Sequence, residues 1–396
     1  MRIEGSGGIA LLAAVIVAVV WANVAGGDAY HRFWEWGHTI DVASMRRHVS
    51  LHAFVNDGLM AIFFYVVGLE IKRELVEGEL NTVRRAALPA IAALGGMIVP
   101  ALVFTAFNAG GPGAHGWGIP MATDIAFAIG VMALLGSRVP FGLKVFLLAL
   151  AIADDLGAII VIAVFYSGAI DVPALIVGMG CMAGVAAALR FGVKSWPVYV
   201  ALGLVAWLAV LESGVHATIA GVALGFLTSA RRDAGDESPL DRIERQLHPW
   251  VSYLVVPVFA LANAGTVVSV DALHAAITSR VALGAGLGLV IGKPVGIVAA
   301  AWVAVRAGLG ELPQGVEWKH ITGAGMLGGI GFTVSLFVTG LAFDDPALVA
   351  DAKIGIFAAS ILAGALGFAW LWLVDRAVAR AQIAARANAT RDAPVS

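Results

Sequence analysis

Long apolar runs separated by short polar gaps follow one another along almost the whole chain. A helix needs about 20 apolar residues to cross the hydrocarbon layer of a membrane. With charged or turn-rich gaps as boundaries, the pattern predicts twelve transmembrane helices, at residues 9–25, 51–71, 87–107, 117–136, 145–166, 173–190, 196–211, 214–229, 249–264, 281–304, 320–341 and 354–374. The expected fold class is therefore an all-α polytopic membrane protein that forms a single transmembrane domain over residues 1–396.

Composition supports this class. The chain is 60% hydrophobic and 13% charged, whereas soluble domains carry roughly 25% charged residues. No basic tract or zinc-ligand spacing indicates nucleic acid, and a single cysteine, Cys181, excludes an intramolecular disulfide. The first run, Ile9–Ala25, could be a signal peptide, but its length, its Trp21 and the Glu4 that offsets its one arginine favour a span.

The distribution of basic residues predicts the orientation. Cytoplasmic loops carry an excess of Lys and Arg. With the N-terminus in the cytoplasm, the cytoplasmic segments hold 19 of the 25 basic residues and the outer loops hold five. This asymmetry supports an even number of spans and places both termini in the cytoplasm.

Two of the predicted spans look interrupted. Residues 117–136 contain Pro120 and the Thr123–Asp124 pair, and residues 320–341 contain a glycine-rich stretch. Each is the middle member of a three-span group, and alternating directions make the two groups, 87–166 and 281–374, inverted repeats. Paired interruptions of this kind indicate a transporter binding site, whereas glycine-rich spans alone indicate close helix packing. The remaining helices, 9–71 and 173–264, are expected to form a scaffold.

Four ionisable residues lie deep in the predicted spans, and all four belong to the two triplets: Asp124, Asp154, Asp155 and Lys293. A charge at the centre of the bilayer costs about 2.5–3.5 kcal/mol even on the mildest scales. Such residues are therefore expected to have a function or a partner.

The doublet Asp154–Asp155 is the strongest candidate for the site. Neighbours on a helix point about 100° apart, so both carboxylates can border one cavity. Two buried carboxylates resist joint ionisation, and their oxygens suit a small hard cation. Protons and a cation then compete for the same oxygens, and that competition is exchange. The alternative is a structural pair, with one aspartate neutralised by Lys293 and the other protonated.

Asp124 and Lys293 suit a crossing of two broken helices. Each half-helix carries about +0.5 charge at its N-terminus and about −0.5 at its C-terminus. A carboxylate offsets two facing N-termini, and an ammonium offsets two facing C-termini. Lys293 precedes Pro294, which biases its backbone away from an ideal helix. The sequence leaves open whether Lys293 pairs with Asp154 or lies with Asp124.

Other titratable residues lie near helix ends. His216 suits either a pH sensor or a polar helix entrance. A further group lies at the predicted cytoplasmic ends of spans 51–71 and 249–264, and it suits either a pH-dependent gate or ordinary solvated helix ends: Glu70, Arg73, Glu74, Glu244 and His248.

Seven motifs in order along residues 9–375 carry a family resemblance: "YVVGLEIKREL", "ATDIAFAIG", "LALAIADDLGAIIVI", "ESGVHATIAGV", "LHPWVSYLVVPVFALANAG", "VIGKPVGI" and "GGIGFTVSLF". The chain resembles the NhaA family of bacterial sodium/proton antiporters, itself a known example of inverted-repeat architecture.

The resemblance implies a role for each candidate residue. Asp154 and Asp155 would form the cation and proton site, with Thr123 and Asp124 at the helix crossing and Lys293 as its ammonium. The five residues at the cytoplasmic helix ends would belong to a pH-responsive region.

The resemblance also implies the activity and its setting. Family members exchange internal Na+ or Li+ for external H+, electrogenically and without a cofactor, in the bacterial inner membrane among its lipids. They form homodimers, partly through a β-hairpin for which residues 26–50 provide the sequence. One departure concerns Arg245, which stands where the family pattern has histidine and which carries a fixed charge instead of a titrating one.

Two other classes are less favoured. An intramembrane aspartyl protease, the enzyme alternative, needs aspartates on different helices, and the chain lacks its Gly-x-Gly-Asp motif. A channel conducts without coupling and has no need of a proton-titrating site.

Overall fold

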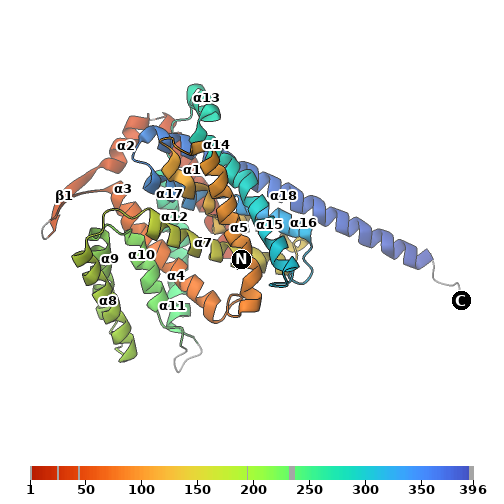
Figure 1. Cartoon of the computed structure of the whole chain (residues 1–396), viewed down its shortest axis with the longest axis horizontal. Coiled ribbons are helices and arrows are strands. Elements are labelled where there is room, and N and C mark those ends of the chain that lie inside the picture. Colours follow the sequence, from red (N-terminus) through yellow and green to blue (C-terminus); the bar gives the residue numbers. More distant parts are fainter. Residues whose placement is uncertain (1, 25, 43–44, 194, 232–236, 392–396) are drawn as a thin grey trace.

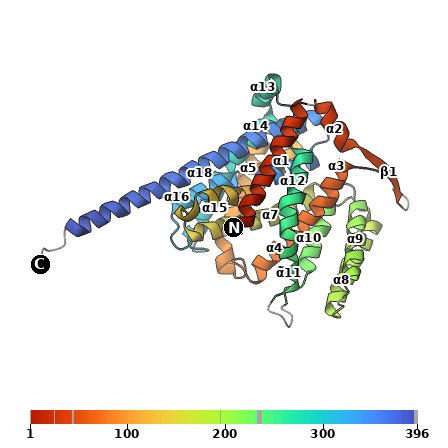
Figure 2. The ribbon, with the colours of Figure 1, turned by 180° about the vertical axis from the view of Figure 1, so that it is seen from behind.

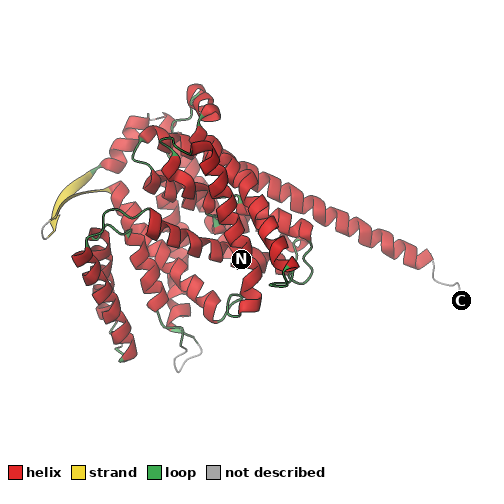
Figure 3. Ribbon diagram, in the orientation of Figure 1, coloured by secondary structure: helices red, strands yellow, loops and turns green. Residues whose placement is uncertain are grey.

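The computed structural model describes residues 2–24, 26–42, 45–193, 195–231 and 237–391. Over these residues the protein is a bundle of helices (Figures 1 and 3). Among the described residues, eight helical segments are long and apolar enough to cross a membrane, and one bent pair of helices makes a ninth candidate span. The predicted polytopic helical class is confirmed at this level, while the number twelve stays a prediction.

The first half of the chain begins with two helices, a hairpin and a long span. These are α1 (Arg2–Val24), α2 (Gly27–Glu35), β1 (Gly37–Val42), β2 (Met45–Ser50), α3 (Leu51–Ala53), the π-helix η1 (Phe54–Leu59) and α4 (Met60–Val76). The two strands are antiparallel, with Gly37 opposite Ser50 and Val42 opposite Met45. The hairpin projects away from the bundle (Figure 1), in the segment where the resemblance implied one.

The first predicted triplet follows. It consists of α5 (Val83–Asn108), the 3₁₀-helix η2 (Ala114–Met121), α6 (Ile125–Leu134), the short η3 (Gly136–Arg138) and α7 (Phe141–Phe165). Residues 122–124 between η2 and α6 are not helical. The middle span of this triplet is therefore broken at Thr123 and Asp124, where the polar pair had indicated it.

A series of helices links the two predicted triplets. They are α8 (Val172–Arg190), α9 (Trp196–Glu212), α10 (Ala217–Leu227), α11 (Pro239–Trp250), the π-helix η4 (Val251–Val255), α12 (Val256–Asn263) and α13 (Val270–Thr278). In both Figure 1 and Figure 2, α8 and α9 stand at the margin beside α10. Three predicted spans, 196–211, 214–229 and 249–264, are not among the candidate spans of the described residues. The first two fall on α9 and α10, which have fewer than 18 residues, and the third covers the end of α11, η4 and α12.

The second predicted triplet closes the chain. It consists of α14 (Arg280–Leu287), the π-helix η5 (Gly288–Gly292), α15 (Lys293–Arg306), α16 (Trp318–Gly328), α17 (Phe332–Ala342) and α18 (Pro346–Arg391). Helices α16 and α17 are bent by 46° at residues 329–331. Helix α18 continues well beyond the bundle (Figure 2).

A π-turn lets the chain pass Pro294 without breaking the helix. Proline has no N–H to donate to the carbonyl four residues earlier. In η5 the register shifts, and the N–H of Lys293 bonds the carbonyl of Gly288, five residues back. The sequence had indicated a departure from helical backbone at Lys293 itself. Lys293 in fact has helical dihedral angles, and the irregularity lies in the preceding turn.

The closest helix contact in the core brings α15 against α5. At Gly95 and Gly296 the two backbones approach so closely that a Cβ on Gly296 would lie 2.1 Å from the Gly95 carbonyl oxygen. Small residues permit this contact between membrane helices. The contact matters for the site because α15 carries Lys293.

Gly296→Ala is expected to lower the free energy of unfolding by about 1–3 kcal/mol, because the two backbones must separate to admit the methyl group. Gly180→Ala is the matched control, since a Cβ at Gly180 in α8 meets no atom within 4 Å. The measurement is the melting temperature of the detergent-solubilised protein. Equal melting temperatures for the two variants would contradict the packing argument.

Candidate ion-binding site

The two broken spans meet where their helices are interrupted. The backbone N–H of Asp124 donates to the carbonyl oxygen of Ile330 over 2.6 Å. The hydroxyl of Thr123 donates to the carbonyl oxygen of Gly328 over 2.9 Å. These two bonds join the non-helical stretch of the first triplet to that of the second. Polar backbone groups freed by one break thus find partners at the other.

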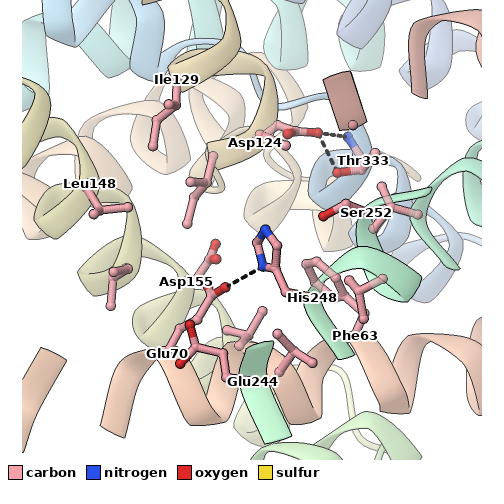
Figure 4. A pocket seen from close by; sticks show the side chains of 18 of the residues that line it. Phe63, Glu70, Asp124, Ile129, Leu148, Asp155, Glu244, His248, Ser252 and Thr333 are labelled. Carbon is pink, nitrogen blue, oxygen red and sulfur yellow. Dashed lines mark hydrogen bonds and ion pairs between the residues drawn. The ribbon is translucent and has the colours of Figure 1, made fainter. Parts of the chain in front are cut away.

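The Asp124 carboxylate accepts hydrogen bonds at the N-termini of two helices. One oxygen accepts the N–H of Phe127, which caps the start of α6, over 3.1 Å. The other accepts the N–H and the hydroxyl of Thr333, in the first turn of α17, over 3.2 and 2.5 Å. Figure 4 shows this contact beside the cavity. Both helices direct their partial positive charges at the same anion, as the sequence had led us to expect.

Lys293 is fully buried and contacts both a carbonyl and a carboxylate. Its amine donates to the carbonyl oxygen of Met121, at the C-terminus of η2, and to Oδ2 of Asp154 over 2.6 Å. The sequence left open whether Lys293 pairs with Asp154 or lies with Asp124, and in the structure it pairs with Asp154. The same ammonium also compensates a helix C-terminus.

The two neighbouring aspartates have different surroundings. Asp154 is 0% exposed and bound to Lys293, whereas Asp155 is 5% exposed and lines the cavity. One carboxylate oxygen of each, Oδ1, is buried without a hydrogen-bond partner in the described part of the chain. Buried carboxylate oxygens are costly unless something pairs with them. A small cation or a proton supplies that pairing.

A cavity of about 670 Å³ leads from Asp155 to the ends of α4 and α11. Glu70 and Arg73 of α4 and Glu244 and His248 of α11 line it. Arg73 pairs with Glu244, and the His248 ring lies 3.5 Å from a Glu70 carboxylate oxygen. Figure 4 shows Asp155, Glu70 and His248 close together. The structure therefore brings together four of the five residues that the sequence had grouped at the cytoplasmic helix ends.

Glu244 has an unusual environment for a carboxylate outside the predicted spans. Burial raises the pKa of Glu244 to about 7, although the neighbouring Arg73 opposes this rise. Its proton therefore leaves near neutral pH. Above that pH a carboxylate pairs with the Arg73 guanidinium, and below it a neutral carboxyl group faces the same guanidinium.

Of the other residues that the sequence singled out, Glu74 and His216 do not line this cavity, whereas Arg245 does. Glu74 accepts a hydrogen bond from the backbone of Glu79 and does not line the cavity. His216 is at the start of α10, its ring 6.0 Å from that of Phe337. Arg245 lines the cavity mouth, where it pairs with Glu237 over 2.9 Å.

Sequence reasoning missed two hydroxyl groups that hold the crossing together. Thr333 binds Asp124, and the hydroxyl of Ser335 donates to the carbonyl of Ile119 over 2.7 Å. Both lie in the motif "GFTVS", directly after the second break. The sequence signal that could have identified them is the presence of hydroxyl residues at the start of the helix after an interruption. Freed backbone groups need polar partners there.

Broken membrane helices that cross at buried carboxylates are typical of secondary ion transporters. A family model described as Na+/H+ antiporter 1 matches residues 1–371. The chain is 49% identical over 375 residues to the Na(+)/H(+) antiporter NhaA of Escherichia coli O157:H7, covering 93% of this chain and 95% of that protein. It is 48% identical over 371 residues to that of Shewanella sp. (strain ANA-3), with the same coverage.

A third relative supports the same assignment. The chain is 45% identical over 420 residues to Na(+)/H(+) antiporter NhaA 2 of Syntrophotalea carbinolica, covering 95% of each protein. The chain belongs to the NhaA family of sodium/proton antiporters, and the resemblance drawn from its motifs is confirmed. Its relatives are named as antiporters, a class of transmembrane exchangers and not of enzymes.

Lys293→Met is expected to destabilise the protein by about 3–5 kcal/mol, because it leaves the buried Asp154 without its partner. The double variant with Asp154→Asn should lose less than the sum of the two single losses. Lys319→Met, which removes a surface pair with Glu317, is the matched control and should be almost neutral. Thermal melting measures all four. Additive losses would show that the pair contributes no coupling energy.

Proposed function

We propose that the protein exchanges cytoplasmic Na+ or Li+ for external H+ at the Asp154–Asp155 site. The observation that carries this proposal is the carboxylate of Asp155, which has a buried unpartnered oxygen and lies at the inner end of the cavity. An ionised carboxylate there supplies hard oxygen ligands for a small cation. A protonated one releases that cation.

Exchange then follows from competition for one set of oxygens. Asp155 meets the cavity, and Asp154 is tied to Lys293, so a cation that approaches both carboxylates competes with a proton at one and with an ammonium at the other. Thr123 and Asp124 border the same place and keep the crossing of the broken spans in shape. The transported ions are the only small molecules that this scheme requires.

We further propose that transport is electrogenic, with more protons entering than sodium ions leaving. Two carboxylates per site permit two protons for each cation. One net charge that moves across 100 mV releases about 2.3 kcal/mol. The membrane potential thereby drives sodium out against its own gradient.

Alternating access is proposed to use the two triplets as moving parts. Residues 87–166 and 281–374 contain both broken spans and every charge of the site, whereas 9–71 and 173–264 supply the scaffold. The orientation with both termini in the cytoplasm of a bacterial inner membrane places the cavity on the cytoplasmic side. A homodimer joined through the β1–β2 hairpin is part of the same proposal, since the hairpin projects from the bundle (Figure 3).

The cytoplasmic residues at the cavity are proposed to regulate exchange by pH. Alkalinisation through pH 7 ionises Glu244, since burial raises its pKa to about 7. The pair with Arg73 then becomes ionic and links α4 to α11 more strongly. His248 and Glu70 lie on the same two helices and form a second contact between them. Glu74 remains a proposal from the resemblance and His216 a proposal from the sequence, and in the described part of the chain neither lines the cavity.

Asp155→Asn is expected to abolish Na+- and Li+-dependent proton movement, because the amide can neither ionise nor release a proton. The measurement is the collapse of an imposed pH gradient in inside-out membrane vesicles after addition of the salt. Asp344→Asn, at an exposed position, is the matched control. Normal exchange by Asp155→Asn would contradict the site assignment. Sodium movement without proton movement in the unaltered protein would indicate a channel.

Glu244→Gln is expected to flatten the dependence of exchange on pH, because glutamine keeps the shape and loses the titration. The effect should lie between about pH 6 and pH 8, on either side of the Glu244 pKa of about 7. The measurement is the exchange rate in vesicles across this range at a fixed Na+ concentration. An unchanged slope would remove Glu244 from the regulatory cluster.

The same experiment has a second arm at the cavity mouth. Arg245→His replaces a fixed charge with a group that titrates near neutral pH, so the pH profile should become steeper. An unchanged profile would show that this position does not contribute to the response.

A further inference from the structure

The first broken span begins with a segment whose own hydrogen bonds are not enough to fix its position. It is the 3₁₀-helix η2, eight residues long (Ala114–Met121), whereas 3₁₀ runs longer than about four residues are uncommon because their hydrogen bonds have poorer geometry. Glycines at Gly116 and Gly118 add backbone freedom. Contacts from other helices must therefore fix where this segment lies.

The inner end of η2 is held by the second triplet. Ser335 of α17 binds the carbonyl of Ile119, and Lys293 of α15 binds the carbonyl of Met121. These contacts connect η2 to the ammonium and the crossing. They leave open what connects η2 to α7, the helix that carries the two aspartates.

Tyr166 makes that connection. It directly follows α7, and its hydroxyl accepts the N–H of Gly118 over 3.0 Å and donates to the carbonyl of His115 over 2.9 Å. The Tyr166 hydroxyl thus uses both its acceptor and its donor capacity in bonds to η2. The Tyr166 side chain is buried. The two bonds grip η2 in its first half, opposite the end that Lys293 and Ser335 hold.

The surroundings of Tyr166 are shaped for this contact. A Cβ on Gly118 would lie 2.6 Å from the Tyr166 hydroxyl oxygen, so only glycine admits the hydroxyl there. The Tyr166 ring lies 5.0 Å from the His115 ring and 6.2 Å from the Trp117 ring. Trp117 in turn meets Phe165, edge to face.

We propose that Tyr166 is a positioning residue for ion exchange. Its hydroxyl sets how deep η2 lies against α7, so that the Met121 carbonyl meets Lys293 while that amine holds Asp154. The residue touches neither ion and acts through η2. This inference rests on the proposed exchange at Asp154 and Asp155, and it adds the residue that aligns the broken span with those aspartates.

Tyr166→Phe tests the proposal, since it keeps the ring and removes both hydrogen bonds. The KM for Na+ in inside-out vesicles is expected to rise about fivefold to tenfold, because a buried N–H and C=O lose their partner and η2 shifts. The maximal rate per folded protein should stay within about twofold. Tyr199→Phe is the matched control, since that hydroxyl donates to the Val193 carbonyl at the surface, and its KM should match the unaltered protein.

A second variant approaches the same contact from the other side. Gly118→Ala leaves Tyr166 intact and displaces its hydroxyl, so its KM for Na+ should rise as well. An unchanged KM in Tyr166→Phe, with exchange present in the unaltered protein, overturns the inference and leaves the proposed function standing. A fall in maximal rate or in folded protein without a change of KM also overturns it, because the hydroxyl would then be only structural. Absence of exchange in the unaltered protein would instead overturn the proposed function.

Discussion

Backbone groups freed by a broken helix must find partners inside the protein, because a membrane interior offers no water to satisfy them. The arrangement around residues 122–124 and 329–331 follows from this constraint. The N–H of Asp124 and the hydroxyl of Thr123 bind carbonyls of the other broken span. The helix termini exposed by the two breaks then carry partial charges, and Asp124 and Lys293 lie where those charges need compensation. The buried charges of Asp124 and Lys293 are thus a consequence of the two interruptions.

The same constraint makes the neighbouring aspartates unequal. Lys293 has to lie against the C-terminus of η2, and from there its amine reaches Asp154 and not Asp155. Asp155 therefore keeps a carboxylate toward the cavity, with one oxygen unpartnered in the described structure. Two adjacent residues of one type thereby acquire different surroundings. A site that binds either a proton or a cation needs an accessible carboxylate such as that of Asp155, held in place by a neighbour such as the Lys293-bound Asp154.

The cavity connects the aspartates physically to the ends of α4 and α11. Glu244 lines the same cavity as Asp155, and burial raises the pKa of Glu244 to about 7. Its partner Arg73 and the Glu70–His248 contact join α4 to α11. A change of charge there alters how strongly the two helices attract each other beside the cavity that Asp155 lines.

The sequence by itself determined the polytopic helical class and the family, and it indicated both interruptions and the buried charged residues beside them. These depend on local properties, since hydropathy, proline and glycine positions and short motifs are read from neighbouring residues. Only the tertiary structure decided that Lys293 pairs with Asp154, which lies 139 residues away in the chain. It alone placed Thr333 and Tyr166 at their partners and moved the irregular backbone from Lys293 to the π-turn before it. Such pairings depend on which helix faces meet, and that is set by the packing of the whole bundle and not by any one segment.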